Sequence, residues 1–164
     1  MPMTTDSSTL HIRLATPADR PRLVSVINSA FSVESFLEGT RTDDERLAAM
    51  MQKGEILLAE NSSGQILASI YAETRGTRGY LGMLAVDPAH QRSGLGKHML
   101  SAAENHFRAT GCEAIDISVL SLRPELLPIY RRIGFTETGT EEFLMSRALK
   151  DDQHCHCITM SKPL

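Results

Sequence analysis

The sequence predicts a single α/β domain built on a mixed sheet. Patterns typical of strands and helices alternate along its 164 residues in the order β-α-α-β-β-β-α-β-α-β-β. Three strand patterns between residues 55 and 86 are joined by short turns, so this part of the sheet is expected to be antiparallel. A helical pattern over residues 94–110 then leads to a strand pattern over 114–120, which is the length of a crossover between parallel strands.

The first part of the chain predicts a tail, one strand and two helices. Residues 1–8 are small and polar and are expected to be a disordered tail, so the domain is assigned to residues 9–164. Thr16, followed by proline, is typical of the start of a helix. Thr42 and Glu45 have the spacing of a capping box, which predicts the start of the second helix.

The remaining elements complete the sheet. Apolar residues at every second position from Ile66 to Ala72 are expected to share one face of a strand. Pro128 falls inside a short helical pattern over residues 124–132, and because proline lacks a backbone donor we expect this helix to be irregular or kinked. The predicted strands are 11–14, 55–59, 65–73, 80–86, 114–120, 135–138 and 154–160.

The composition excludes several classes of protein. Hydrophobic residues make up 41% and charged residues 23%, which is typical of a globular domain. With 17 basic and 20 acidic residues the net charge is −3, so general binding to nucleic acid or an anionic membrane is not expected. The sequence shows no apolar run near the ~20 residues of a membrane span, no signal-peptide pattern and no disulfide framework among its three cysteines. We therefore expect a cytoplasmic protein with neither nucleic acid nor membrane as a partner.

Two glycines, Gly94 and Gly96, stand where the predicted crossover helix begins. The first turn of a helix leaves about four backbone N–H groups unpaired, and the helix dipole adds positive charge there. Glycine lets a large anion approach this backbone, and Lys97 adds a basic side chain. The pattern predicts a pyrophosphate site. It is neither a P-loop, which would need glycine at Gln91, nor a dinucleotide fingerprint, which would need glycine at Met99.

Two motifs carry a family resemblance. Gln91-Arg92-Ser93-Gly94-Leu95-Gly96 resembles the Q/R-x-x-G-x-G/A signature of the GNAT superfamily of acyl-CoA-dependent N-acetyltransferases. The run from Tyr130 to Phe135 is similar to the Tyr-x-x-x-Gly-Phe segment of that family. The resemblance implies a GNAT-like domain with a mixed, mostly antiparallel sheet flanked by helices, in which a splayed parallel strand pair admits acetyl-CoA.

The resemblance also implies which residues bind acetyl-CoA. Backbone amides of the glycine-rich run would hold its pyrophosphate, the strand edge at Leu84 would pair with its pantetheine arm, and an amide near Leu84 would donate to the thioester oxygen. Arg123 stands where family members often carry asparagine and is expected to contact phosphate or adenine instead. The implied cofactor-binding residues are Leu84, Ala85, Val86, Gln91, Arg92, Ser93, Gly94, Leu95, Gly96, Lys97 and Arg123.

The implied reaction needs an acid and a base. Tyr130 is the candidate acid, because a phenol with a pKa near 10 can protonate a departing thiolate whose thiol has a pKa near 8.5. Glu73 and Glu34 are candidates for the base that takes a proton from the amine.

The expected function is transfer of acetyl from acetyl-CoA to a primary amine of a small molecule or peptide, by direct attack in a ternary complex. The alternative is a non-catalytic sensor that binds acyl-CoA in the same place. A third reading uses His154-Cys155-His156-Cys157 as a metal or redox site, but alternation on a strand would separate the histidines from the cysteines, so no metal is expected. A homodimer is left open, because final strands often pair between subunits.

Overall fold

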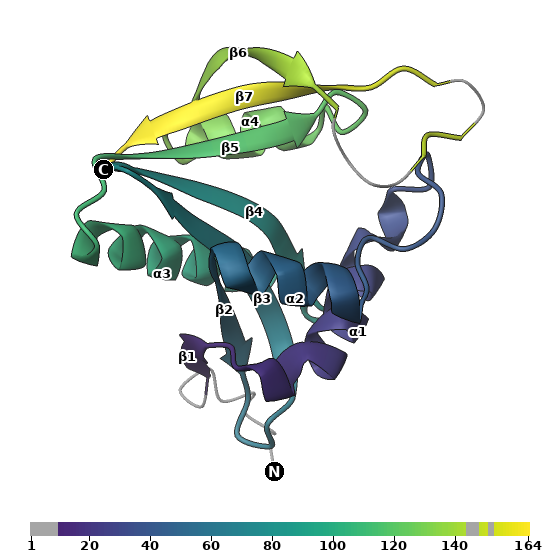
Figure 1. Cartoon of the computed structure of the whole chain (residues 1–164), viewed down its shortest axis with the longest axis vertical. Coiled ribbons are helices and arrows are strands. Elements are labelled where there is room, and N and C mark those ends of the chain that lie inside the picture. Colours follow the sequence, from purple (N-terminus) through teal and green to yellow (C-terminus); the bar gives the residue numbers. More distant parts are fainter. Residues whose placement is uncertain (1–9, 144–147, 151–152) are drawn as a thin grey trace.

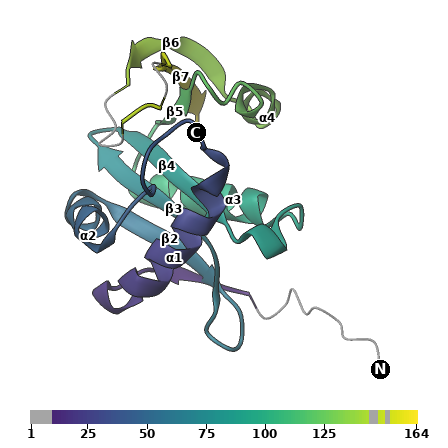
Figure 2. The same cartoon turned by 90° about the vertical axis from the view of Figure 1, so that its right-hand side faces the viewer.

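A computed structural model of the chain describes residues 10–143, 148–150 and 153–164. Its seven strands form one sheet in the order β1-β2-β3-β4-β5-β7-β6, which confirms the single mixed α/β domain. Helices α1 and α2 cover one face, and α3 and α4 cover the other (Figures 1 and 2). The strands are β1 (His11–Leu14), β2 (Glu55–Glu60), β3 (Ile66–Arg75), β4 (Arg78–Val86), β5 (Ala114–Leu120), β6 (Thr136–Glu142) and β7 (His156–Pro163). The helices are α1 (Arg20–Ala30), α2 (Asp44–Lys53), α3 (Leu95–Ala109) and α4 (Leu126–Arg132), with short 3-10 turns η2 (Pro17–Asp19), η3 (Phe31–Val33) and η4 (Pro88–His90).

The parallel pair β4 and β5 is splayed. Pairing between them covers only Arg78–Tyr80 of β4, and beyond Tyr80 the two strands diverge (Figure 1). On its other edge β4 carries a bulge, because Met83 and Leu84 together lie opposite the single residue Ile70 of β3. Met83 there has a φ of 49°, which is unusual for a residue with a side chain. Bulges bend a strand and increase its twist, so this one turns β4 away from β5.

Two apolar clusters hold the helices on the sheet. Met99, Ala103 and Phe107 of α3 are fully buried against the central strands. A Cβ on Gly79 would lie 2.6 Å from the ring of Phe107, so only glycine lets α3 pack this closely. On the other face Leu23 of α1 and other apolar side chains of α1 and α2 pack on β2 and β3. Burying one large apolar side chain contributes about 1.5–3 kcal/mol.

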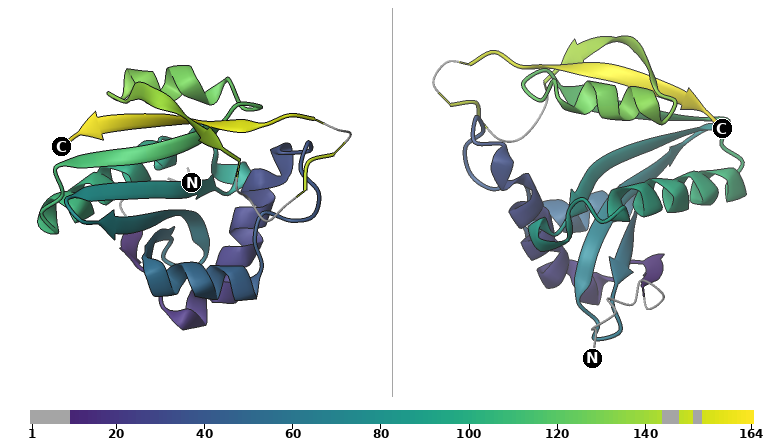
Figure 3. Two further views of the ribbon diagram at one scale, coloured as in Figure 1. Left: turned by 45° about the horizontal axis from the view of Figure 1, so that its top comes forward. Right: turned by 180° about the vertical axis from the view of Figure 1, so that it is seen from behind.

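The loop between η3 and α2 joins the two diverging halves of the sheet. The amide of Glu38 donates to the carbonyl of Ala148 at 2.9 Å, and the amide of Lys150 donates to the carbonyl of Phe36 at 2.9 Å. Leu37 lies between these contacts and forms an isolated bridge with Leu149. The connection before β7 therefore meets the connection before α2 at the open end of the splay (Figure 3).

Local capping differs from the sequence prediction in the first two helices. The predicted capping box of Thr42 and Glu45 is wrong: Asp43 caps α2, and its carboxylate accepts from the amide of Arg46 at 2.8 Å. Thr42 is instead buried, with its backbone amide donating to Asn28 at 2.9 Å. Thr16 begins the short turn η2 rather than α1, and its amide donates to the carboxylate of Asp19.

Two further local expectations change for reasons of register. Ile66 does not share a cluster with Ala68, because the pairing of β2 with β3 shifts between Ala59 and Glu60. The helix expected over 124–132 begins at Leu126, so Pro128 lies in its first turn, where backbone N–H groups have no partner within the helix anyway. No helix in the described part of the chain is long and apolar enough to cross a membrane.

Candidate active site

A cavity of about 500 Å³ lies where β4 and β5 diverge. Its lining includes Gln91, which belongs to the glycine-rich run before α3, and Leu100 of α3. It also includes Phe31, Glu34 and Arg123. The remaining lining residues are Ala30, Arg41, Ile70, Tyr80, Leu81, Gly82, Met83, Leu84, Val86, Ile117, Ser118, Val119, Leu120, Leu126, Ile129, Tyr130 and Cys157.

The start of α3 has the geometry that the glycine pattern predicts. Gly94 caps the helix with a φ of 83°, and Arg92 before it has a φ of 67°, so the chain turns sharply into the helix. The first backbone hydrogen bond runs from the amide of His98 to the carbonyl of Gly94 at 3.2 Å. The amides of Leu95, Gly96 and Lys97 precede it and belong to the turn that has no acceptor within the helix. Together with the positive end of the helix dipole, unpaired amides of this kind have the geometry of an anion site.

The open edge of β4 lies beside this anion site. Leu84 and Val86 line the cavity, whereas Ala85 is buried in the apolar cluster under α1, as alternation along a strand requires. Beyond Tyr80 no strand among the residues that the structure describes pairs with the edge of β4 that faces β5. The bulge at Met83 is the feature that the sequence did not indicate, since nothing in the residue types marks a positive φ there.

Tyr130 lies on α4 and lines the cavity. Its ring meets the ring of Phe135 edge-on, with centroids 5.7 Å apart, which fixes the phenol in place. Burial raises the pKa of Tyr130 above its ordinary value, and the positive charge of Arg123 opposes part of that rise. The phenol therefore stays protonated at neutral pH and can donate a proton inside the cavity.

Glu73 lies on β3 opposite Tyr80, outside the cavity lining. Its carboxylate accepts from the hydroxyl of Tyr71 at 2.6 Å and is paired with Arg75, whose guanidinium stacks on the ring of Tyr80. Partial burial pushes the pKa of Glu73 upward, but the hydrogen bonds from Tyr71 and Arg75 outweigh it, and the net pKa lies below the usual value. Tyr130 therefore lines the cavity, and Glu73 does not.

Glu34 and Arg123 meet across the cavity. Arg123 Nη1 lies 3.2 Å from Glu34 Oε2, although the two residues are 89 positions apart in the sequence. Arg123 Nε donates to Glu125 at 2.6 Å, and Arg41 lies 3.9 Å from the other oxygen of Glu34. The structure therefore places Arg123, which the resemblance assigns to cofactor binding, in the cavity lining and in contact with the carboxylates of Glu34 and Glu125.

The cysteine- and histidine-rich segment before the C-terminus forms the beginning of β7. The strand starts at His156, two residues later than predicted, and His154 precedes it. Cys157 is buried in the cavity wall, and burial, with the nearby charge of Glu141, raises the pKa of its thiol. Within residues 10–143, 148–150 and 153–164, no group of three or more His, Cys, Asp or Glu side chains is arranged to hold a metal ion.

The chain is similar in sequence to known acetyltransferases. The model of the acetyltransferase (GNAT) domain family matches residues 27–147, well over half of the chain. The chain belongs to this family. Mycothiol acetyltransferase of Propionibacterium freudenreichii subsp. shermanii is 29% identical over 131 residues, which are 75% of this chain and 42% of that protein. The chain thus spans about two fifths of that relative's length.

Solved structures of acetyltransferases share the fold over almost the whole chain. The ribosomal-protein-S18-alanine N-acetyltransferase from Escherichia coli superposes with a TM-score of 0.75 at 18% identity, covering 94% of this chain and 93% of its own. The structure of yncA, a putative acetyltransferase from Salmonella typhimurium with its cofactor acetyl-CoA, gives a TM-score of 0.72 at 22% identity, with 94% of both chains covered. This GNAT member therefore has the splayed β4–β5 arrangement of a GNAT fold.

Proposed function

We propose that this GNAT domain transfers the acetyl group of acetyl-CoA to a primary amine by direct attack in a ternary complex. The observation that carries the proposal is one cavity lined by Gln91 before the start of α3, by Leu84 and Val86 on the open edge of β4, and by Tyr130. A structural neighbour was solved with acetyl-CoA as its cofactor, which supports the same donor here.

The residues divide the work of binding acetyl-CoA. The amides of Leu95, Gly96 and Lys97 hold the pyrophosphate, with Arg92 and Lys97 adding side-chain charge. The pantetheine arm pairs with the free edge of β4 at Leu84 and Val86 as an added strand would. The bulge at Met83 turns the backbone at the middle of the cavity, where an amide donates to the thioester oxygen as it gains charge.

The chemical step transfers one acetyl group and two protons. The amine nitrogen attacks the thioester carbon, a C–N bond forms, and the C–S bond breaks. Tyr130 gives its proton to the departing thiolate, and a base takes a proton from the amine. The sequence offers Glu73 and Glu34 as candidates for that base. Glu34 is the carboxylate that lines the cavity, so comparing Glu73→Gln with Glu34→Gln decides which of them shapes the acidic limb of the pH–rate profile.

Calorimetry with acetyl-CoA and an assay of CoA release test the proposal. Acetyl-CoA should bind saturably, and release of CoA should require an added primary amine. Gly96→Glu should abolish binding, because a Cβ at Gly96 would have only Val86 as a neighbour, at 4.0 Å, and the added carboxylate would occupy and repel the phosphate position. Gly96→Gln, of similar size and no charge, separates repulsion from bulk. Saturable binding with no turnover on any amine would favour the non-catalytic sensor.

A second set of proposals concerns the setting of the enzyme. We propose that it acts in the cytoplasm without a metal, and that its partners are acetyl-CoA and the acceptor amine, not nucleic acid or a membrane. The net charge of −3 supports the exclusion of polyanions. A homodimer is tested by light scattering of the purified protein.

A further inference from the structure

We propose that the acceptor is a small amine carrying a carboxylate next to its amino group, such as a free α-amino acid, held between Arg123 and Glu34. This inference rests on the proposed acetyl transfer and names its second substrate. It arises from the ion pair of Arg123 with Glu34, which lines the cavity and whose arginine has no role in the catalytic scheme above.

The ion pair joins the two halves of the splayed sheet. Glu34 follows η3 on the side of α1, and Arg123 lies between β5 and α4 on the other side. Their side chains are 3% and 17% exposed, so both charges are largely withdrawn from water. Removing two charged groups from water has a large unfavourable desolvation free energy. For this reason such a pair often stabilises a protein no more than apolar residues in its place would. A buried pair that borders a cavity is therefore better explained by what the cavity binds.

Arg123 retains donors for a second carboxylate. A guanidinium has five N–H donors in a planar fork. Two of them are used, one by Glu125 through Nε and one by Glu34 through Nη1. The other three donate no hydrogen bond to any residue in the described part of the chain. A planar fork with free N–H groups is the geometry that binds a carboxylate with two parallel hydrogen bonds.

Glu34 supplies the opposite charge on the same wall. Its carboxylate lies 3.2 Å from Arg123 and 3.9 Å from Arg41 and brings a negative charge to the cavity wall. One negative and one positive group, side by side in a largely apolar cavity, are complementary to a zwitterion. A simple amine would pair with Glu34 alone, and a peptide amine would bring no carboxylate to Arg123.

The surrounding wall leaves room for an apolar side chain. Phe31, Tyr80 and Ile129 line the same cavity, and Ile129 is 50% exposed. Covering it would bury apolar surface worth about 25 cal/mol per Å². Burial raises the pKa of Tyr130, and the positive charge of Arg123 lowers it in part. The phenol that donates the proton therefore lies close enough to the proposed carboxylate site to interact with it electrostatically.

Matched acceptors test the inference. Leucine, leucinamide and isoamylamine share a side chain and differ in the carboxylate, and the corresponding phenylalanine series extends the comparison to an aromatic side chain. Of leucine and phenylalanine, one will have the higher kcat/KM in the CoA-release assay. For that amino acid kcat/KM should exceed the value for its amide by about tenfold or more, because the amide leaves the Arg123 donors unpaired. A dipeptide with leucine at its N-terminus, leucyl-glycine, should have a kcat/KM similar to that of leucinamide.

Arg123→Gln should lower kcat/KM for the amino acid about 10- to 100-fold while changing kcat/KM for the amide less than about threefold, with KM for acetyl-CoA unchanged. Arg131→Gln is the matched control, because Arg131 pairs with Glu137 at the exposed end of α4 and does not line the cavity. It should leave both substrates unaffected. Arg123→Lys keeps the positive charge without the planar fork, and its kcat/KM for the amino acid should lie between those of wild type and Arg123→Gln. If the glutamine variant does not fold, the lysine variant takes its place in the test.

The failures are distinguishable. Absence of acetyl-CoA binding, or absence of turnover with every amine, would overturn the proposed function and the inference with it. Turnover in which amides, peptides or simple amines match the amino acids, or an Arg123→Gln effect equal for amino acid and amide, would overturn the inference and leave acetyl transfer intact.

Discussion

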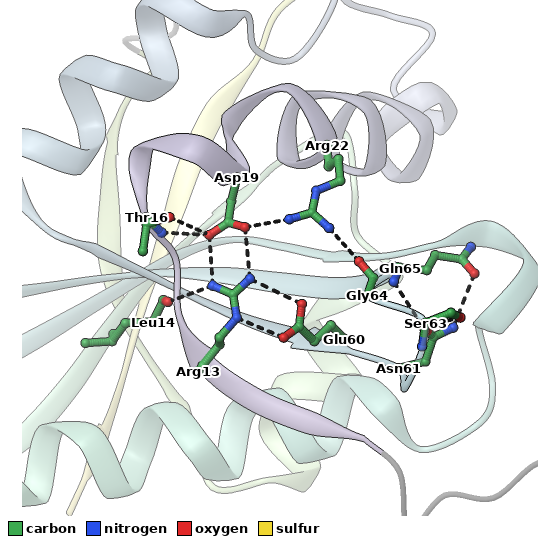
Figure 4. Close-up of polar contacts among 10 residues, drawn as sticks. All are labelled: Arg13, Leu14, Thr16, Asp19, Arg22, Glu60, Asn61, Ser63, Gly64 and Gln65. Atoms are coloured by element: carbon green, nitrogen blue, oxygen red, sulfur yellow. Dashed lines mark hydrogen bonds and ion pairs between the residues drawn. The ribbon is translucent and has the colours of Figure 1, made fainter.

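Two buried carboxylates, Asp19 and Glu34, each lie between two arginines, yet their surroundings differ. Both side chains are 3% exposed. Asp19 accepts from Arg13 through both of its oxygens, at 2.8 and 2.9 Å, and from Arg22 at 2.7 Å, in a packed corner where β1 meets η2 (Figure 4). Glu34 has longer described contacts with its arginines, 3.2 and 3.9 Å, and borders the cavity.

The difference teaches that the same chemical pair can hold a fold or bind a substrate. At the Asp19 corner Arg13 also binds Glu60 of β2, so the guanidinium is shared between two carboxylates of the protein itself. At the cavity Arg123 keeps donors that no described residue takes. Changes at the corner should therefore act on stability, and changes at the cavity should act on catalysis.

The largest effect is expected from Tyr130→Phe, which belongs to the cavity. Loss of the proton donor should lower kcat about 10²–10⁴-fold. The phenylalanine ring keeps the edge contact with Phe135, so the free energy of unfolding should change by less than about 1 kcal/mol. Steady-state kinetics and urea denaturation measure the two quantities. An unchanged kcat would remove Tyr130 from the acid role.

Asp19→Asn should do the reverse. Removing one partner of a buried pair typically lowers the free energy of unfolding by about 3–5 kcal/mol. Here the asparagine would withdraw the negative charge that Arg13 and Arg22 share, and it would leave Arg13 with Glu60. The folded variant should keep the kcat of the wild type. Asp44→Asn is the matched control, since Asp44 is 65% exposed in its pair with Arg20 and should contribute less than about 1 kcal/mol. A loss of kcat without loss of stability would break the comparison.

Acid should weaken the Asp19 corner selectively. Hydrogen bonds from Arg13 hold the pKa of Asp19 well below its usual range, against the opposing effect of burial. The folded carboxyl group thus stays ionised where the unfolded one, with a pKa near 3.9, takes up a proton. The stabilisation is complete well above pH 4 and is lost as the pH falls below about 4. The difference in unfolding free energy between wild type and Asp19→Asn should shrink over that range, and a constant difference would contradict the assignment.

An effect on stability smaller than that of Asp19→Asn is expected at the two ends of α3. Gly94 and Gly111 have φ values of 83° and 82°, and a Cβ at either would meet no atom within 4 Å. Alanine at each position should cost about 1–2 kcal/mol through backbone strain alone. Only Gly94→Ala should also weaken acetyl-CoA binding in calorimetry, because Gly94 shapes the anion site. Equal affinities for the two variants would mean that the loop geometry at Gly94 does not serve the pyrophosphate.

Much of the fold was readable because it depends on near neighbours in the chain. The strand patterns, the start of α3 at Gly94 and the position of Tyr130 on a short helix follow from local periodicity and glycine placement. The capping box at Thr42 failed because tertiary packing buried that threonine against Asn28, leaving Asp43 to cap the helix. Local spacing indicates which residues are able to cap, and packing decides which one does.

The sequence by itself indicated the candidate anion site, since the unpaired amides at the start of α3 belong to the consecutive residues Leu95, Gly96 and Lys97 and need no distant partner. Only the tertiary structure decided that Arg123 contacts Glu34 and that Glu73 does not line the cavity. Both depend on where β4 turns away from β5 at its bulge, and that divergence is set by strand pairing and packing between segments far apart in the chain.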